Sequence, residues 1–103
     1  MEAVLDGHIE ITPDVRGGRP RITGTRITVA DIVIMHLRLG KSLEEIAGKY
    51  NLDLAGTHAA MAYYYDHRSE IDGSIEADEA FAEAFRHNNP LLLQAKLRAL
   101  RSG

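Results

Sequence analysis

The sequence predicts a mainly α-helical protein in which an N-terminal β-ribbon precedes a helix-turn-helix domain and C-terminal helices. Three observations indicate this fold. Residues 8–29 contain short β-rich runs that are interrupted by glycine and proline. From Val29 onward, apolar residues instead recur at spacings of three and four, as on one face of a helix. The helical segments that follow are separated by short turns, which is typical of a helix-turn-helix.

The β-ribbon is expected to form around Gly24. The runs RPRIT and TRITV on its two sides are candidates for the strands of a hairpin. Alternation with period two assigns Ile22 and Ile27 to one side of this ribbon. The same alternation assigns Arg21 and Arg26 to the opposite side, where they face solvent.

Three helices are expected between residues 30 and 70. The first ends at Gly40. The second begins with a capping box formed by Ser42 and Glu45, and the third follows the N-cap Asp53. The inner face of the first helix is expected to hold Ile32, Val33, Met35, His36, Leu37 and Leu39. The inward stripe of the third is expected to hold Thr57, Ala60, Met61 and Tyr64.

The outer face of the third helix is the candidate surface for reading DNA. It carries no side chain that donates a hydrogen bond to a base edge. Its expected members are Ala55, Ala59, Ala62 and Asp66. His58 and Tyr63 flank this face and are candidates for contacts with phosphates. A smooth alanine face that packs against another helix is the alternative interpretation.

Asp72 and Gly73 are expected to end the helix-turn-helix domain, which therefore spans residues 1–72. Residues 73–103 are expected to form a C-terminal helical extension with an apolar seam. Such a seam fits a groove on a partner protein, folds back on the domain, or joins two copies of the chain. The residues expected to contact a partner are Phe81, Phe85, Leu93, Leu97 and Leu100.

Composition excludes several kinds of chemistry. The chain of 103 residues has no cysteine, which removes disulfides, thiolate metal sites and a cysteine nucleophile. His58 and His67 lie on opposite sides of a straight helix and cannot share a metal. The close acidic pairs fall on faces expected to be solvated. We therefore expect no enzymatic activity, no metal, no cofactor and no small-molecule substrate.

Hydropathy and length bear on location and on partners. No basic segment precedes an apolar stretch at the N-terminus, and no apolar run reaches the roughly 18 residues of a membrane span. The sequence therefore predicts a cytoplasmic protein that does not enter a membrane. A chain of this length buries only about two-thirds of its unfolded surface, so that a partner chain would stabilise it.

The arginines of the run RGGRPRITGTR form the only local positive patch in a chain whose net charge is -3. They are Arg16, Arg19, Arg21 and Arg26. Gly17 and Gly18 let the backbone come close to a phosphate. The patch therefore indicates contact with an anion. The alternative is that the arginines are solvated, or paired with Asp14 and Asp31.

The segments ITPDVRGGRPRITGTRITVADIV and LGKSLEEIAGKYNLDLAGTHAAMAYY closely resemble the DUF433 family. Its members read roughly Gly-Gly-x-Pro-x-Ile-x-Gly-Thr-Arg-Ile-x-Val, then Gly-x-Ser-x-Glu-Glu-Ile-Ala, then Ala-x-x-Tyr-Tyr. The resemblance covers residues 9 to about 72. The matching positions are Gly18, Pro20, Ile22, Gly24, Thr25, Arg26, Ile27 and Val29, followed by Ser42, Glu45, Ile46 and Ala47.

Gly56 and Thr57 depart from the family pattern, which has a longer polar residue and an apolar residue near these positions. Gly56 in a first helical turn costs about 1 kcal/mol relative to alanine. The third helix is therefore expected to be weak at the end that would meet DNA.

The resemblance implies a homeodomain-like or winged helix-turn-helix and a VapB-like antitoxin of a type II toxin–antitoxin system. It implies that the chain binds and silences a toxin with a PIN-like ribonuclease fold, and that it represses its own operon as a homodimer or as a complex with the toxin. The residues expected to contact operator DNA, or the acidic metal site of the toxin, are Arg16, Arg19, Arg21, Arg26, His58 and Tyr63. Phe81, Phe85, Leu93, Leu97 and Leu100 are expected to bind the toxin.

Two other functions remain open at this point. The first is a stand-alone transcriptional regulator in which the C-terminal extension is a dimerisation element. The second is a folded adaptor that binds no DNA, which the alanine-rich third helix favours.

Overall fold

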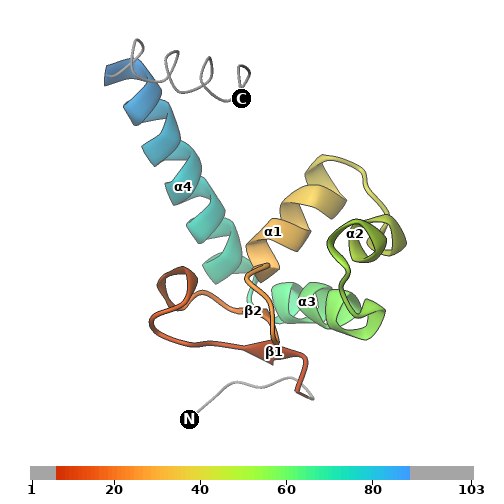
Figure 1. The fold of residues 1–103 in the computed structure, drawn as a ribbon. Coiled ribbons are helices and arrows are strands. Elements are labelled where there is room, and N and C mark those ends of the chain that lie inside the picture. The colour runs from red at the N-terminus through yellow and green to blue at the C-terminus, as the bar shows by residue number, and fades with distance from the viewer. Residues whose placement is uncertain (1–6, 89–103) are drawn as a thin grey trace, which may run out of the picture. The chain divides into compact units, whose positions relative to one another are not determined.

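The computed structural model describes residues 7–88 (Figure 1). They belong to two compact units, of which the first ends at Asp72 and the second begins at Gly73. The elements are β1 (Ile9–Glu10), the 3₁₀ turn η1 (Arg16–Gly18), β2 (Arg21–Ile22), α1 (Val29–Val33), the π turn η2 (Ile34–Arg38), α2 (Leu43–Tyr50), α3 (Leu54–Asp66) and α4 (Arg68–Asn88). The predicted fold class is confirmed, since a small antiparallel ribbon precedes a mainly helical chain.

The ribbon pairs β1 with β2, rather than the two runs around Gly24. Ile9 lies opposite Ile22 and Glu10 lies opposite Arg21. The two runs around Gly24 are joined less regularly, by an isolated antiparallel bridge between Arg21 and Thr28. Backbone hydrogen bonds also join them, from the Ile22 amide to the Ile27 carbonyl, from the Val29 amide to the Pro20 carbonyl and from the Thr25 amide to the Ile22 carbonyl. The strand that pairs with β2 is β1, which lies in the segment HIEIT at least 11 residues earlier. The turn signal at Gly24 indicates only pairing between neighbouring residues and did not predict this partner.

The two sides of the ribbon are not as the alternation predicted. Ile9 and Ile22 are buried, as an inner face requires, but Arg21 is also buried and only 5% exposed. The prediction that Arg21 faces solvent is therefore wrong. Period-two alternation assumes that one face of the ribbon is open, whereas the loop that follows β2 and the side chain of Glu10 enclose the guanidinium.

The first helix begins with a capping box at Thr28, whose hydroxyl accepts from the Asp31 amide while the Asp31 carboxylate accepts from the Thr28 amide. It continues into η2, and the chain turns at Gly40 with a φ of 71°. Leu37 and Leu39 are 49% and 62% exposed, so their predicted place on the inner face is wrong. A π turn holds more residues per turn than an α-helix and so rotates the later side chains away from the core.

The second and third helices follow α1 and η2, and short turns separate them. Ser42 and Glu45 make the predicted capping box at α2, and the Asp53 carboxylate accepts from the Ala55 amide at the start of α3. Asn51 ends α2 in the left-handed conformation. The inward stripe of α3 is confirmed, because Thr57, Ala60, Met61 and Tyr64 are all buried.

Gly56, expected to be the weak point of α3, has a packing role. A Cβ atom built at this position would lie 3.0 Å from Cγ2 of Ile22. Glycine therefore lets α3 approach β2 closely, and the cost in helix propensity is offset by contact between the helix and the ribbon.

The predicted boundary between Asp72 and Gly73 coincides with the boundary between the two compact units, but the helix break after α3 falls earlier, at His67. His67 has a φ of -133°, and α4 then runs from Arg68 through Gly73 to Asn88. A glycine inside a helix costs only about 1 kcal/mol, and this one has no positive φ. Within the described residues, none of the helices is long and apolar enough to cross a membrane.

Candidate functional site

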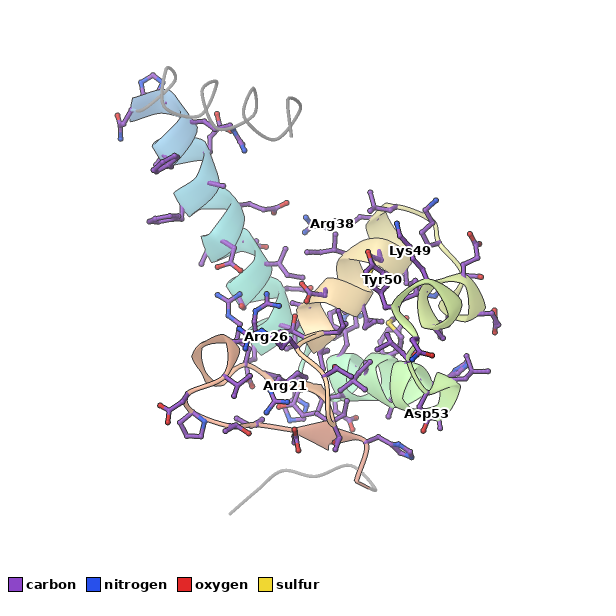
Figure 2. All side chains as sticks on the ribbon, viewed as in Figure 1. Arg21, Arg26, Arg38, Lys49, Tyr50 and Asp53 are labelled. Carbon is purple, nitrogen blue, oxygen red and sulfur yellow. The ribbon has the colours of Figure 1, made fainter. Side chains whose placement is uncertain are left out.

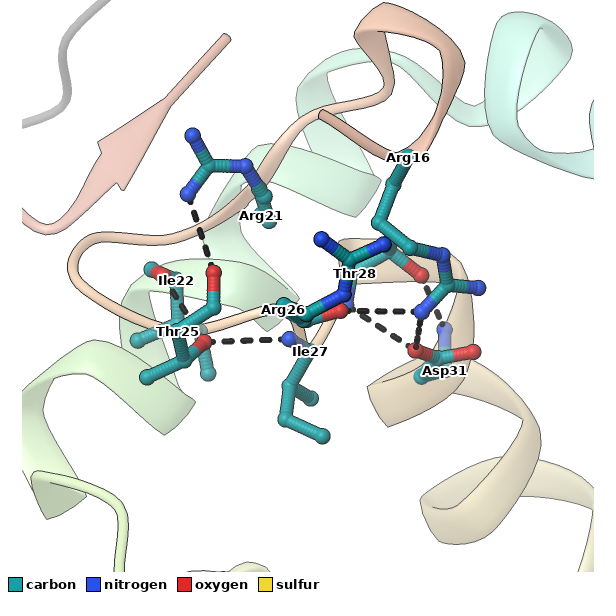
Figure 3. A network of polar contacts seen from close by, with 8 residues as sticks. All are labelled: Arg16, Arg21, Ile22, Thr25, Arg26, Ile27, Thr28 and Asp31. Atoms are coloured by element: carbon teal, nitrogen blue, oxygen red, sulfur yellow. Dashed lines mark hydrogen bonds and ion pairs between the residues drawn. The ribbon is translucent and has the colours of Figure 1, made fainter. Parts of the chain in front are cut away.

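The arginine-rich segment folds into a loop whose backbone is held from several sides (Figure 3). The Thr25 hydroxyl donates to the Ile22 carbonyl at 2.9 Å and accepts from the Ile27 amide at 3.0 Å. The Ile22 amide also donates to the Ile27 carbonyl at 2.9 Å. These bonds close residues 22–27 into a tight loop, so that its outward side chains are presented from a fixed backbone.

Arg21 holds this loop from inside. Its Nη1 donates to Oε1 of Glu10 at 2.7 Å and to the Thr25 carbonyl at 2.9 Å, and its Nη2 donates to the Thr12 hydroxyl at 2.7 Å. The hydrogen bond from Arg21, and then that from the Gly24 amide, lower the pKa of Glu10 below its ordinary value. Because its side chain is enclosed and used in this way, Arg21 stabilises the loop and is not available to a partner.

Arg16 holds the same loop from the other side. Its Nη1 donates to the Arg26 carbonyl at 2.9 Å and lies 3.3 Å from Oδ2 of Asp31. The same carboxylate oxygen accepts from the Thr28 amide and so belongs to the cap of α1. The alternative that these arginines pair with Asp31 therefore holds for Arg16.

Arg26 is the arginine that the loop offers to solvent. Its side chain is exposed, and among residues 7–88 its guanidinium forms no hydrogen bond or ion pair. Arg19 is half-buried. The four arginines predicted to form one patch therefore have different roles, and Arg26 is the strongest candidate for contact with an anion.

The two candidate residues on α3, His58 and Tyr63, differ in their exposure to solvent. His58 is exposed, as expected. Tyr63 is only 6% exposed, which contradicts its predicted place beside an open face. Its ring stacks on that of His67 with centroids 4.0 Å apart, and burial raises its pKa above the ordinary value, with a further contribution from Glu70. Tyr63 therefore packs the junction of α3 with α4 and does not reach a phosphate.

The exposed surface of α3 has few groups that could read or grip DNA. It carries neither arginine nor lysine, and the Asp53 carboxylate caps the helix end that would approach phosphates. Ala59, expected on the outer face, is buried. The exposed members of α3 are Leu54, Ala55, His58, Ala62, Tyr65 and Asp66.

The apolar stripe of α4 is exposed on the helix. Phe81 is 74% exposed, Ala77 and Ala84 are exposed, and Phe85 is half-buried. Six acidic residues and two arginines lie on the same helix, which is therefore strongly acidic. Leu93, Leu97 and Leu100, predicted to continue the stripe, lie outside the described residues.

An apolar groove between η2 and α2 was missed by sequence reasoning. Its larger hollow has a volume of about 460 Å³ and is lined in part by Met35, Leu39 and Tyr50. A neighbouring hollow of about 230 Å³ is lined by Ile27 together with Met35 and Tyr50. Because Leu39 was predicted to face inward, this η2–α2 groove was not predicted. The π turn places Leu39 at the edge of the groove.

In the part of the chain that the structure describes, no group of three or more His, Asp or Glu side chains is placed to hold a metal ion. The Arg26 loop (residues 22–27), the stripe of α4 and the η2–α2 groove are candidates for binding, by charge or by apolar contact.

Comparison with known proteins assigns the ribbon and the helices from α1 to most of α3 to a family. The model of DUF433, described as a protein of unknown function, matches residues 9–64. Neither a curated protein nor a solved structure matches the chain. The match includes the Arg26 loop and most of α3, and it ends before α4 begins. Because the matched segment spans more than half of the sequence, the chain belongs to the DUF433 family.

Proposed function

We propose that the chain is the antitoxin of a type II toxin–antitoxin system, and that it binds and neutralises a PIN-like ribonuclease through α4. The observation that carries this proposal is the exposure of Phe81, at 74%, within an apolar stripe. A large aromatic side chain in water gains about 25 cal/mol for each Å² of apolar surface that a partner buries. An amphipathic helix that docks in a groove of another protein uses such a stripe.

The charge of α4 supports a ribonuclease as that partner. A ribonuclease must attract a polyanion, and its RNA-binding cleft is therefore electropositive. The helix carries six acidic residues and two arginines, and the acidic residues Glu76 and Glu83 are exposed. An acidic helix with an apolar stripe competes with RNA for such a cleft, and its charge accelerates the encounter.

The second part of the proposal is repression of the chain's own operon. The helices α1 to α3 would supply the scaffold for DNA binding. However, α3 carries few side chains that can donate hydrogen bonds to base edges, which argues against base recognition by this helix. We assign the contact with operator phosphates to Arg26, on its fixed loop, and to His58. Contact of Arg26 with carboxylates of the toxin is the competing assignment. A stand-alone regulator is the alternative function, favoured by the helix-turn-helix architecture itself.

Co-expression with the product of the neighbouring gene tests the function directly. The antitoxin proposal expects the two proteins to elute together in size-exclusion chromatography with light scattering. It also expects the partner to cleave RNA once the complex is dissociated and the partner refolded alone. A neighbouring product that elutes separately, or that has no ribonuclease activity after release, would contradict the proposal and favour the stand-alone regulator.

A further inference from the structure

The exposed stripe of α4 and the segment that follows this helix belong to the same compact unit. The stripe consists of Ala77, Phe81, Ala84 and Phe85, and Phe81 is 74% exposed. Residues 89–103 lie outside the described residues. Their sequence holds a second apolar seam, which consists of Leu93, Leu97 and Leu100. Two amphipathic helices that are joined by a short connection bury such faces against each other in a helical hairpin.

The sequence of the connection favours a sharp reversal of the chain. α4 ends at Asn88, and Asn89 and Pro90 follow. A proline disfavours the helical conformation of the residue before it, so Asn89 is expected to interrupt the helix. Asparagine is also a preferred N-cap, and proline is a preferred first residue of a new helix. A connection of about two residues is typical of antiparallel neighbouring helices.

The spacing of the apolar residues agrees with this reversal. Leu93 and Leu97 are four residues apart, as are Phe81 and Phe85. An antiparallel register that places Leu97 opposite Phe81 therefore brings the other leucine opposite the other phenylalanine, because both helices rise by about 1.5 Å per residue. The midpoint of this register is Asn89, which is the residue at which the proline interrupts the helix. Spacing and chain reversal thus lead to the same arrangement.

The charges of the two segments are complementary in the same register. α4 carries six acidic residues and two arginines, whereas residues 89–103 carry three basic residues and no acidic one. Asp78 lies about 60° from Phe81 around its helix, and Arg101 lies about 40° from Leu97 in the same rotational sense. In antiparallel helices that face each other, equal senses of rotation fall on the same side of the interface. The register therefore brings Arg101 to the side of Asp78, within one residue of its level.

We propose that residues 90–102 fold back on α4 in the free chain and cover its apolar stripe. The segment forms a helix antiparallel to α4, in which Leu97 packs on Phe81 and Arg101 pairs with Asp78. The hairpin itself does not depend on the function proposed above, but its role in regulation rests on that function. A toxin that binds the stripe must first displace the segment, and the apparent affinity falls with the fraction of chains in which the stripe is open.

A pair of introduced cysteines tests the register in the full chain, which has no cysteine of its own. Ala77→Cys with Leu100→Cys joins positions that the hairpin brings together. Glu79→Cys with Leu100→Cys is the matched control, because Glu79 is as close in level but lies on the opposite side of α4. The proposal expects the first pair to form a disulfide within one chain at least about tenfold faster than the control. Equal rates, or a disulfide that joins two chains, would overturn it.

A charge exchange tests the proposed pair in the cysteine-free chain. A lysine-specific protease cleaves after Lys96, and the hairpin protects this site from cleavage. Asp78→Arg and Arg101→Asp each place like charges together, and each is expected to speed up cleavage about threefold. The double variant restores the pair in reverse, and its cleavage rate should return to within about twofold of the wild type. A double variant that is cleaved as fast as the single ones would overturn the proposed register.

Inhibition by the locked hairpin tests its regulatory role. The neighbouring ribonuclease is titrated with the Ala77→Cys, Leu100→Cys chain after oxidation and again after reduction. The oxidised form should require at least about tenfold more protein than the reduced form, whereas the cysteine-free wild type should inhibit equally after both treatments. Equal inhibition by both forms of the variant would overturn the regulatory role. A hairpin in a wild-type chain that inhibits no ribonuclease would leave the hairpin standing and remove the proposed function.

Discussion

Arg21 and Glu10 form a hydrogen-bonded ion pair across the ribbon, with Nη1 of the arginine 2.7 Å from Oε1 of the carboxylate. Through the same nitrogen the arginine also holds the Thr25 carbonyl. One enclosed guanidinium thus joins β1, β2 and the loop that presents Arg26. Within the matched Gly-Thr-Arg segment, the Thr25 carbonyl accepts from Arg21 and the Arg26 carbonyl accepts from Arg16, and both hydrogen bonds keep the loop rigid.

Replacing Arg21 by alanine should therefore destabilise the fold. The Thr25 carbonyl and the Thr12 hydroxyl lose their donor, and the buried side chain leaves a void. We expect Arg21→Ala to lower the free energy of unfolding by about 2 kcal/mol. Arg26→Ala, at an exposed position in the same loop, should change it by no more than about 0.5 kcal/mol. Urea denaturation followed by circular dichroism measures both, and equal losses would contradict the different roles of the two arginines.

The same pair gives the ribbon a dependence on pH. The pKa of Glu10 is lowered from its ordinary value of 4.5. A carboxylate with a lowered pKa in the folded state stabilises the fold above its unfolded pKa, and this contribution is lost as the pH falls through the folded value. The wild type should therefore exceed Glu10→Gln in stability at pH 7, and the difference should shrink as the pH drops below 4.5. A constant difference over that range would exclude the ion pair as its cause.

Two glycines should respond to alanine with opposite signs. At Gly56 the new Cβ atom would press on the buried side chain of Ile22 at 3.0 Å. We expect Gly56→Ala to cost about 1 kcal/mol despite its better helix propensity. Gly73 also lies inside a helix but has nothing within 4 Å of its Cβ position, so Gly73→Ala should stabilise by about 0.5–1 kcal/mol. Thermal unfolding compares them, and a gain at Gly56 would show that α3 does not need its close approach to β2.

Binding to the DNA upstream of the gene should depend on Arg26. If its guanidinium neutralises one phosphate, Arg26→Ala lowers the slope of log affinity against log salt by about 0.9 for each chain bound. Arg38→Ala serves as a control outside the loop (Figure 2). Fluorescence anisotropy between low and physiological salt measures the slopes. An unchanged slope for Arg26→Ala, in a chain that binds this DNA, would assign Arg26 to another partner.

The local features of this fold were accessible from the sequence, because they depend on residues a few positions apart. The cap at Ser42 and Glu45 and the inward stripe of α3 follow from spacing alone. Burial of Arg21 was not accessible, because its partners Glu10 and Thr12 lie 11 and 9 residues away, at the end of β1 and just after it. The turn signal at Gly24 gives no information on the pairing of β1.

The candidate sites followed the same division. Arg26 and His58 were identified from charge and residue type, and both are exposed. Tyr63 was predicted to lie beside the open outer face of α3, but its side chain is buried and its ring stacks on that of His67 at the end of α3. The η2–α2 groove escaped notice because it depends on a π turn, which apolar spacing does not distinguish from a continued α-helix.

Inhibition of the neighbouring ribonuclease by two matched variants tests the central claim most directly. Phe81 and Tyr65 are both exposed aromatic residues, at 74% and 58%, but only Phe81 belongs to the stripe of α4. The ribonuclease is titrated with each folded variant, and cleavage of a fluorescent RNA is followed. The account predicts that the wild type and Tyr65→Glu inhibit equally, whereas Phe81→Glu requires at least about tenfold more protein. Inhibition by Phe81→Glu at the wild-type concentration would contradict the assignment of α4 to the toxin.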